Sequence, residues 1–187
     1  MKKLAVVFSG NGYHNDRPLL HHATNLMKGF GFEVIDVEYG IFPKGSNMDE
    51  ACELVKQYAQ EYLCHVRWED YDQIVFIAKS LGTVAAGYIA DQLAYPIGCL
   101  MLTPLPQTLP YLKKEHQMVF YALNDPYCDA ASIKSYCQTH QIESFCFTNE
   151  YSIEPTDTLE CTYILLEIVN RYRVYMKNHT YLQLQMS

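Results

Sequence analysis

Short apolar runs alternate with helical patterns six times along this chain. The runs are rich in Val, Ile and Phe and mostly lack the strict alternation of a strand with one exposed face, so they predict strands buried on both faces. The predicted strands cover 4–9, 33–38, 73–78, 98–103, 118–122 and 142–147. The predicted helices cover 16–30, 48–67, 81–94, 107–114, 129–140 and 156–178.

This alternation predicts an α/β fold: a three-layer α/β/α sandwich around a mostly parallel six-stranded sheet. No internal repeat, linker or low-complexity segment divides residues 1–187, so we expect a single domain, with residues 178–187 as a frayed tail or an edge strand. Pro18 suits the first turn of the first helix, and Asp16 and Asp129 are predicted to cap the first and fifth helices.

Composition narrows the range of partners. Apolar residues make up 49% of the chain and charged residues 19%, which is ordinary for a soluble globular protein. The net charge of −7 argues against nucleic acid and anionic membranes as partners. The seven cysteines have no CxxC spacing, so we expect buried thiols in a reducing, cytoplasmic compartment, with neither a metal site nor a cofactor.

The segment from Ile74 to Ala86 carries the strongest chemical signal. It consists of an apolar strand, then Ser80 in a tight turn, then a helix rich in small residues. This is the pattern of a nucleophile elbow, in which a strained strand-to-helix turn holds a serine oxygen above the sheet. Ser80 is therefore the candidate nucleophile.

Ligands of an open parallel sheet bind at the carboxyl ends of its strands, so the loops that follow the strands form the candidate site. We call this edge of the sheet the rim. Asp125 lies in the fifth rim loop, two strands after Ser80. The order serine, acid, histidine predicts a histidine in the sixth loop, 148–155, which contains none.

The chain resembles the small, cap-less α/β-hydrolase-fold proteins of bacteria over nearly its whole length. The resemblance rests on residues 8–13 (FSGNGY), 16–20 (DRPLL), 39–45 (YGIFPKG), 79–83 (KSLGT) and 125–127 (DPY). It implies that Ser80 is the nucleophile and Asp125 the orienting acid. It also implies that Tyr151 stands at the position of the catalytic histidine, and that Ala78 replaces the leading glycine of the elbow.

The elbow predicts an oxyanion hole made of the backbone N–H groups of Leu81 and Asn11. His14 is the one histidine in a rim loop, where it serves as a substitute base or merely lines the pocket. Cys128 also lies on the rim, and a Cys128–His14 nucleophile pair is a further alternative. Tyr151 is a poor base because a phenol with a pKa near 10 stays protonated at neutral pH.

Two function classes follow from these residues. In the first, the chain is a serine hydrolase of a small ester, thioester or amide, with an incomplete triad and low or unusual activity. In the second, it is an inactive hydrolase-fold protein that binds a small ligand or a protein partner. A flavodoxin-like nucleotide binder is disfavoured because the first loop lacks the third glycine of a GxGxxG motif. Residues 103–115 offer a small lid at most.

Overall fold

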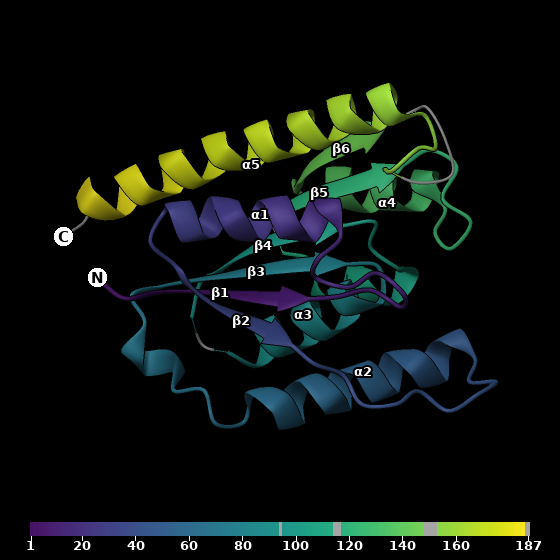
Figure 1. The fold of residues 1–187 in the computed structure, drawn as a ribbon, viewed down its shortest axis with the longest axis horizontal. Helices are drawn as coiled ribbons and strands as arrows, with labels where there is room; N and C mark the ends of the chain where they lie inside the picture. Colours follow the sequence, from purple (N-terminus) through teal and green to yellow (C-terminus); the bar gives the residue numbers. More distant parts are fainter. Residues whose placement is uncertain (94, 114–116, 148–152, 186–187) are drawn as a thin grey trace.

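Six parallel strands form the sheet of the computed structural model, which describes residues 1–93, 95–113, 117–147 and 153–185. The strand order is β2-β1-β3-β4-β5-β6, and every neighbouring pair runs parallel, so the arrowheads in Figure 1 point to one end of the sheet. Each strand begins and ends within one residue of its predicted bounds. The strands are β1 (Lys3–Phe8), β2 (Glu33–Val37), β3 (Gln73–Lys79), β4 (Ile97–Leu102), β5 (Gln117–Ala122) and β6 (Glu143–Phe147).

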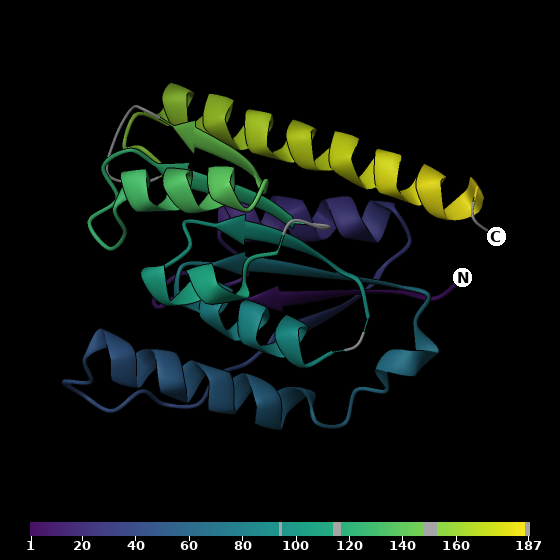
Figure 2. The same ribbon diagram turned by 180° about the vertical axis from the view of Figure 1, so that it is seen from behind.

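Helices cover both faces of the sheet, which confirms the predicted three-layer sandwich. α1 and α5 lie on one face, and α2, α3 and α4 lie on the other (Figures 1 and 2). A separate hydrophobic core fills the space on each side. The helices are α1 (Pro18–Gly29), α2 (Met48–Leu63), α3 (Leu81–Gln92), α4 (Ala130–Thr139) and α5 (Thr158–Gln185), with the short 3₁₀ helices η1 (Trp68–Asp70) and η2 (Pro106–Tyr111).

The central strand β3 is buried along its whole length. Val75 and Ile77 belong to the core beneath α1 and α5, while Phe76 and Ala78 belong to the core beneath α2 and α3. Successive side chains of a strand point to opposite faces, so both sets are apolar where helices cover both faces. The exceptions lie at the two ends of β3, where Gln73 is polar and Lys79 is charged, and both are buried.

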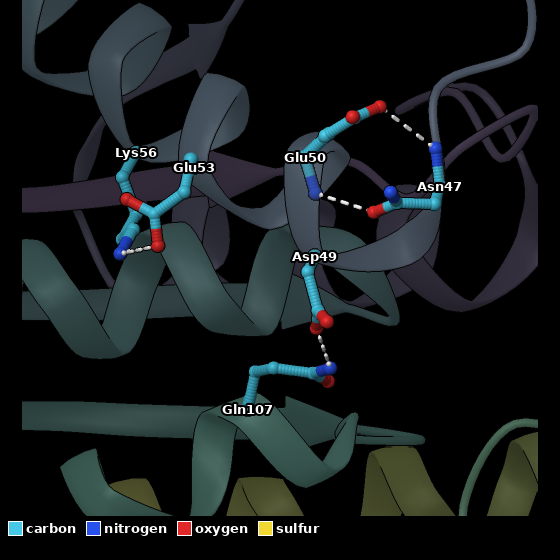
Figure 3. Close-up of polar contacts among 6 residues, drawn as sticks. All are labelled: Asn47, Asp49, Glu50, Glu53, Lys56 and Gln107. Carbon is cyan, nitrogen blue, oxygen red and sulfur yellow. Dashed lines mark hydrogen bonds and ion pairs between the residues drawn. The ribbon is translucent and has the colours of Figure 1, made fainter.

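A capping box holds the start of α2 (Figure 3). The Asn47 side chain accepts a hydrogen bond from the Glu50 N–H at 2.9 Å, and the Glu50 carboxylate accepts one from the Asn47 N–H at 3.1 Å. Both bonds satisfy N–H groups that have no acceptor inside the helix. The predicted cap of α4 is confirmed, because the Asp129 carboxylate accepts hydrogen bonds from the first-turn N–H groups of that helix.

The prediction that Asp16 caps α1 is wrong. Pro18 occupies the first turn as predicted, but the N-cap residue is Arg17 and its side chain makes no capping bond. The Leu19 N–H donates instead to the hydroxyl of Tyr13 at 3.1 Å. This acceptor comes from the preceding loop, outside the short spacing by which a cap is recognised in a sequence.

The helix predicted over 107–114 is the 3₁₀ helix η2. Pro110 inside it has no N–H to donate to an α-helical ladder. Its side chains hold it against neighbouring helices: Thr108 shares a hydrogen bond of 2.6 Å with Thr83 of α3, and Gln107 donates one of 2.8 Å to Asp49 of α2 (Figure 3). The described part of the segment 103–115 is thus anchored to the body of the protein and does not stand apart as a lid.

α5 continues to Gln185, so residues 178–185 of the tail predicted to be frayed or to form an edge strand are helical. Residues 158–185 contain neither glycine nor proline, and nothing in that stretch interrupts a helix. α5 runs back along the sheet, and both ends of the chain lie at the end opposite the rim (Figure 1). None of the helices in the described part of the chain is long and apolar enough to cross a membrane.

Candidate active site

Ser80 forms the turn between β3 and α3. Its backbone has φ 51° and ψ −121°, a region that costs a non-glycine residue of the order of 1–3 kcal/mol. Hydrogen bonds fix the turn on both sides: the Ser80 N–H donates to the Leu102 carbonyl, and the Ser80 carbonyl accepts from the N–H and the hydroxyl of Thr83. A strand, a strained turn and a helix are the components of a nucleophile elbow, in the place where the sequence predicts one.

Two glycines bring other backbone close to this turn. A Cβ on Gly82, in the first turn of α3, would overlap the carbonyl oxygens of Phe8 and Ser9 at the end of β1. A Cβ on Gly10 would lie 3.2 Å from the Cβ of Ser80. α3 therefore packs on the end of β1 only because Gly82 has no side chain, and the loop after β1 lies directly against the serine.

The predicted oxyanion donors are the N–H groups of Leu81, which directly follows Ser80, and of Asn11, in the loop whose Gly10 lies against Ser80. Leu81 is the first residue of α3, so its N–H has no acceptor within the helix. Gly10 and Tyr13 pair through two backbone hydrogen bonds of 3.1 Å, which place Asn11 in a tight turn. Within the described residues the Asn11 N–H donates no hydrogen bond. Two such N–H groups beside a serine suit the binding of a negatively charged oxygen.

Asp125 lies on the same rim, in the loop between β5 and α4. Its side chain is half-buried, and its Oδ1 accepts a hydrogen bond of 2.9 Å from the Tyr127 N–H. Aspartate makes this bond in many ordinary turns, so the bond itself is structural. β4 lies between the strand that ends at Ser80 and the strand that leads to Asp125.

Backbone hydrogen bonds continue the sheet one residue beyond three of its strands. In each case the first residue after a strand donates its N–H to a backbone carbonyl of the neighbouring strand. The donor–acceptor pairs are Ser80–Leu102, Thr103–Phe120 and Leu123–Phe147, at 2.9, 2.7 and 2.8 Å. Thr103 has a positive φ of 46°, as Ser80 does, so the chain turns sharply after both β3 and β4. These bonds fix the serine and the start of the acid loop relative to one another.

No protein-family model matches the sequence, and none of the curated proteins matches it significantly. Solved structures do match. An esterase from Pyrococcus furiosus superposes with a TM-score of 0.65 at 12% identity, over 95% of this chain and 82% of the esterase. An α/β serine hydrolase homologue from Coxiella burnetii gives 0.62 at 10% identity, over 91% and 84%. A serine hydrolase without lid from Xanthomonas campestris gives 0.57 at 12% identity, over 91% and 82%.

The chain has the α/β-hydrolase fold. In this fold the acid and then the histidine follow the nucleophile along the chain, each in a rim loop. Ser80 and Asp125 keep that order. Tyr151, which the resemblance places at the histidine position, lies outside the residues that the structure describes, as do all of 148–152.

His14 and Cys128 are the other rim candidates. The His14 side chain is exposed, and within the described residues no hydrogen bond joins it to Ser80 or to Cys128. Cys128 is buried, and burial together with the nearby acid groups raises the pKa of its thiol to about 11. The thiolate is the nucleophilic form of cysteine, so this shift disfavours Cys128 as a nucleophile at neutral pH.

Lys79 introduces a positive charge beneath the α/β-hydrolase rim that the sequence analysis did not single out. Its side chain is only 8% exposed. Nζ donates a hydrogen bond of 3.3 Å to Thr103 Oγ1 and lies 4.5 Å from the centre of the Tyr13 ring. A cation over an aromatic face is stabilised by the ring quadrupole, which partly replaces the water that burial removes.

Tyr13 links this lysine to an acid beyond β6. The Tyr13 hydroxyl donates a hydrogen bond of 2.6 Å to Glu154 Oε1. Burial, and then the bond to Glu154, raise the pKa of Tyr13 far above its ordinary value, so the hydroxyl stays protonated. The first and sixth rim loops are thereby joined next to Lys79. In the sequence, a lysine that ends a mostly apolar strand is the signal that could have pointed to this cluster.

Among the described residues, no three His, Cys, Asp or Glu side chains lie together as possible metal ligands. The described part of the rim offers a serine in a strained turn, two backbone N–H groups, an aspartate and a buried lysine.

Proposed function

We propose that this chain is a serine hydrolase that cleaves a small ester or thioester. Ser80 attacks the acyl carbon, the N–H groups of Leu81 and Asn11 stabilise the oxyanion, and Asp125 orients the base. The observation that carries this proposal is the strained backbone of Ser80, at φ 51° and ψ −121°, in a turn that leads directly from a buried strand into a helix. The esterase and serine hydrolases among the similar structures support it.

We further propose that the substrate is a small molecule and that the site lies open to solvent in the cytoplasm. The net charge of −7 supports a partner that is neither nucleic acid nor an anionic membrane. The anchoring of η2 supports an open site, since this segment is the one that the sequence offered as a lid.

Labelling with a fluorophosphonate, followed by intact-mass analysis, tests the nucleophile. We expect one adduct on the wild-type protein and none on Ser80→Ala. Ser135→Ala, which removes an exposed hydroxyl on α4, is the matched control and should label like wild type. A wild-type protein without an adduct, or an adduct that persists in Ser80→Ala, would contradict the proposal.

The second candidate function is binding of a small ligand or partner without turnover, and the tyrosine at position 151 favours it. Tyr151→His separates the two within the same experiment. If the protein is an active hydrolase with an incomplete triad, the fluorophosphonate should label Tyr151→His at least several-fold faster than wild type. A binding protein whose rim is not arranged for catalysis should gain no labelling.

A further inference from the structure

Lys79 is a buried cation that directly precedes the serine. Lysine is almost never fully buried in folded proteins unless its charge is paired, and burial of a charge is costly. Five of the six residues before it in β3 are apolar and all six are buried. An apolar side chain at position 79 would therefore pack at a lower cost in free energy. The reason for a lysine at this position has to lie in the groups around its Nζ.

The ammonium group lies over the end of β4, between the strand of the serine and the strand of the acid. Nζ bonds Thr103, which is the residue that follows β4. Because β4 lies between β3 and β5, the end of β4 is located between Ser80, which follows β3, and the Asp125 loop, which follows β5. A catalytic histidine bonds both the serine and the acid, so it occupies the region between them. Lys79 supplies a nitrogen in that region.

We propose that Lys79, in place of a histidine, accepts the proton of the Ser80 hydroxyl, an inference that rests on the proposed function. Lysine serves as the base for a serine nucleophile on other folds, so the pairing is chemically sound. Within the described residues the Ser80 hydroxyl makes no hydrogen bond, so no bond to another group has to break when it gives up its proton.

Burial shifts Lys79 toward the neutral amine that a base must be, whereas the face of the Tyr13 ring stabilises the charged form. Burial lowers the pKa of Lys79 below the ordinary value for lysine, and the negative charges of Glu154 and Asp125 oppose part of that shift. Tyr13 is the other titratable group that faces Nζ, and it stays neutral because its own pKa is raised. One carboxylate on each side can then stabilise the ammonium that forms when Lys79 takes a proton.

The reaction balances with these groups alone. The Ser80 oxygen forms a bond to the acyl carbon as its proton passes to Lys79, and the carbonyl electron pair moves to the oxygen. The bond to the leaving group breaks, and the leaving alkoxide or thiolate takes the proton from the lysine ammonium. Water then adds to the acyl-serine with Lys79 as proton acceptor, and the proton returns to Ser80 as the carboxylic acid leaves.

His14 is the competing base, and its position is less suitable. Its side chain is exposed on the loop between β1 and α1. β1 lies on the side of β3 away from β4 and β5, so His14 approaches Ser80 from the side opposite the acid. Asp125 could not orient His14 in the way that a triad requires.

The rate of fluorophosphonate labelling tests this assignment in Lys79→Met, Lys79→Arg and His14→Gln. We expect both Lys79 variants to label at least about 100-fold more slowly than wild type, and His14→Gln to label at the wild-type rate. Lys79→Arg is the informative variant because guanidinium keeps the positive charge but cannot accept a proton. Lys134→Met, an exposed lysine on α4, controls for the loss of a lysine elsewhere.

Labelling of Lys79→Arg at the wild-type rate would overturn the inference, because charge alone would then suffice. A loss of labelling in His14→Gln would overturn it in favour of the histidine. If neither Lys79 variant folds, the pH profile decides. A profile that His14→Gln leaves unchanged supports Lys79, whereas a rise that levels off near the ordinary histidine pKa of about 6.5 and disappears in His14→Gln contradicts it.

Failure of this inference differs from failure of the proposed function. If wild type labels at Ser80 and the Lys79 variants label equally well, the serine hydrolase stands and only the base is wrong. If wild type does not label at all, the proposed function and the inference fall together.

Discussion

The serine side and the acid side of the rim are built by different means. On the serine side, formed by Gly10, Ser80 and Gly82, backbone packs on backbone so closely that added Cβ atoms meet their neighbours. On the acid side, Asp125 is held by one side-chain hydrogen bond in a partly exposed loop. Close backbone packing requires glycine at particular positions, whereas a partly exposed loop held by one hydrogen bond tolerates many different residues. The serine side can therefore be predicted from the sequence, whereas the acid side is much harder to predict.

Of the substitutions considered, Gly82→Ala should lower the stability of the protein most, because it disrupts the close packing of the serine side. Its Cβ would overlap the carbonyl oxygens at the end of β1, and backbone cannot give way as a flexible side chain can. We expect a loss of about 3 kcal/mol in the free energy of unfolding, measured with urea. Gly29→Ala is the matched control, since its Cβ meets nothing within 4 Å. A loss in Gly82→Ala no larger than in Gly29→Ala would show that the close approach is not required.

Tyr13→Phe tests the link between the first rim loop, on the serine side, and the sixth rim loop. The variant keeps the ring beneath Lys79 but loses the hydrogen bonds to Glu154 and from the Leu19 N–H. We expect urea unfolding to report a loss of about 2 kcal/mol. Tyr163→Phe, exposed on α5, should change the free energy of unfolding very little. Equal values for the two variants would mean that the buried bonds contribute no net stability.

Asp125→Ala should affect stability least while slowing the chemistry. Only the hydrogen bond from the Tyr127 N–H is lost, in a partly exposed turn, so we expect a cost below about 1 kcal/mol. Labelling at Ser80 should nevertheless slow by about tenfold or more if Asp125 acts on the base. Asp129→Ala gives the opposite pattern, a lost helix cap with unchanged labelling. Similar labelling rates in the two variants would remove Asp125 from the mechanism.

Much of the fold could be predicted because a strand that is buried on both faces appears in the sequence as a run of mostly apolar residues. β3 and β5 read as continuous apolar runs, and the structure finds them buried at every position. The errors fall where local pattern does not decide. Pro110 makes η2 a 3₁₀ helix, and the cap of α1 comes from Tyr13, a contact that exists only after the first loop has folded.

The site was predictable to the extent that it is built from backbone. Gly82 is required by a close approach of backbone, and the sequence pattern correctly located the strand-to-helix turn at Ser80. Lys79 was missed because its importance comes from strands brought side by side, β3, β4 and β5, rather than from neighbours in the chain. A lysine in an apolar run is ambiguous until the position of its Nζ is known.

The return path of α5 has a practical consequence for attaching the protein to a surface. Because β1 begins and α5 ends at the edge of the sheet opposite the rim, a linker joined to either terminus leads away from Ser80 (Figure 1). A protein tethered to a bead or a sensor by one end would present the rim to the solution. Reagents would then reach the serine as freely as they do for the untethered protein.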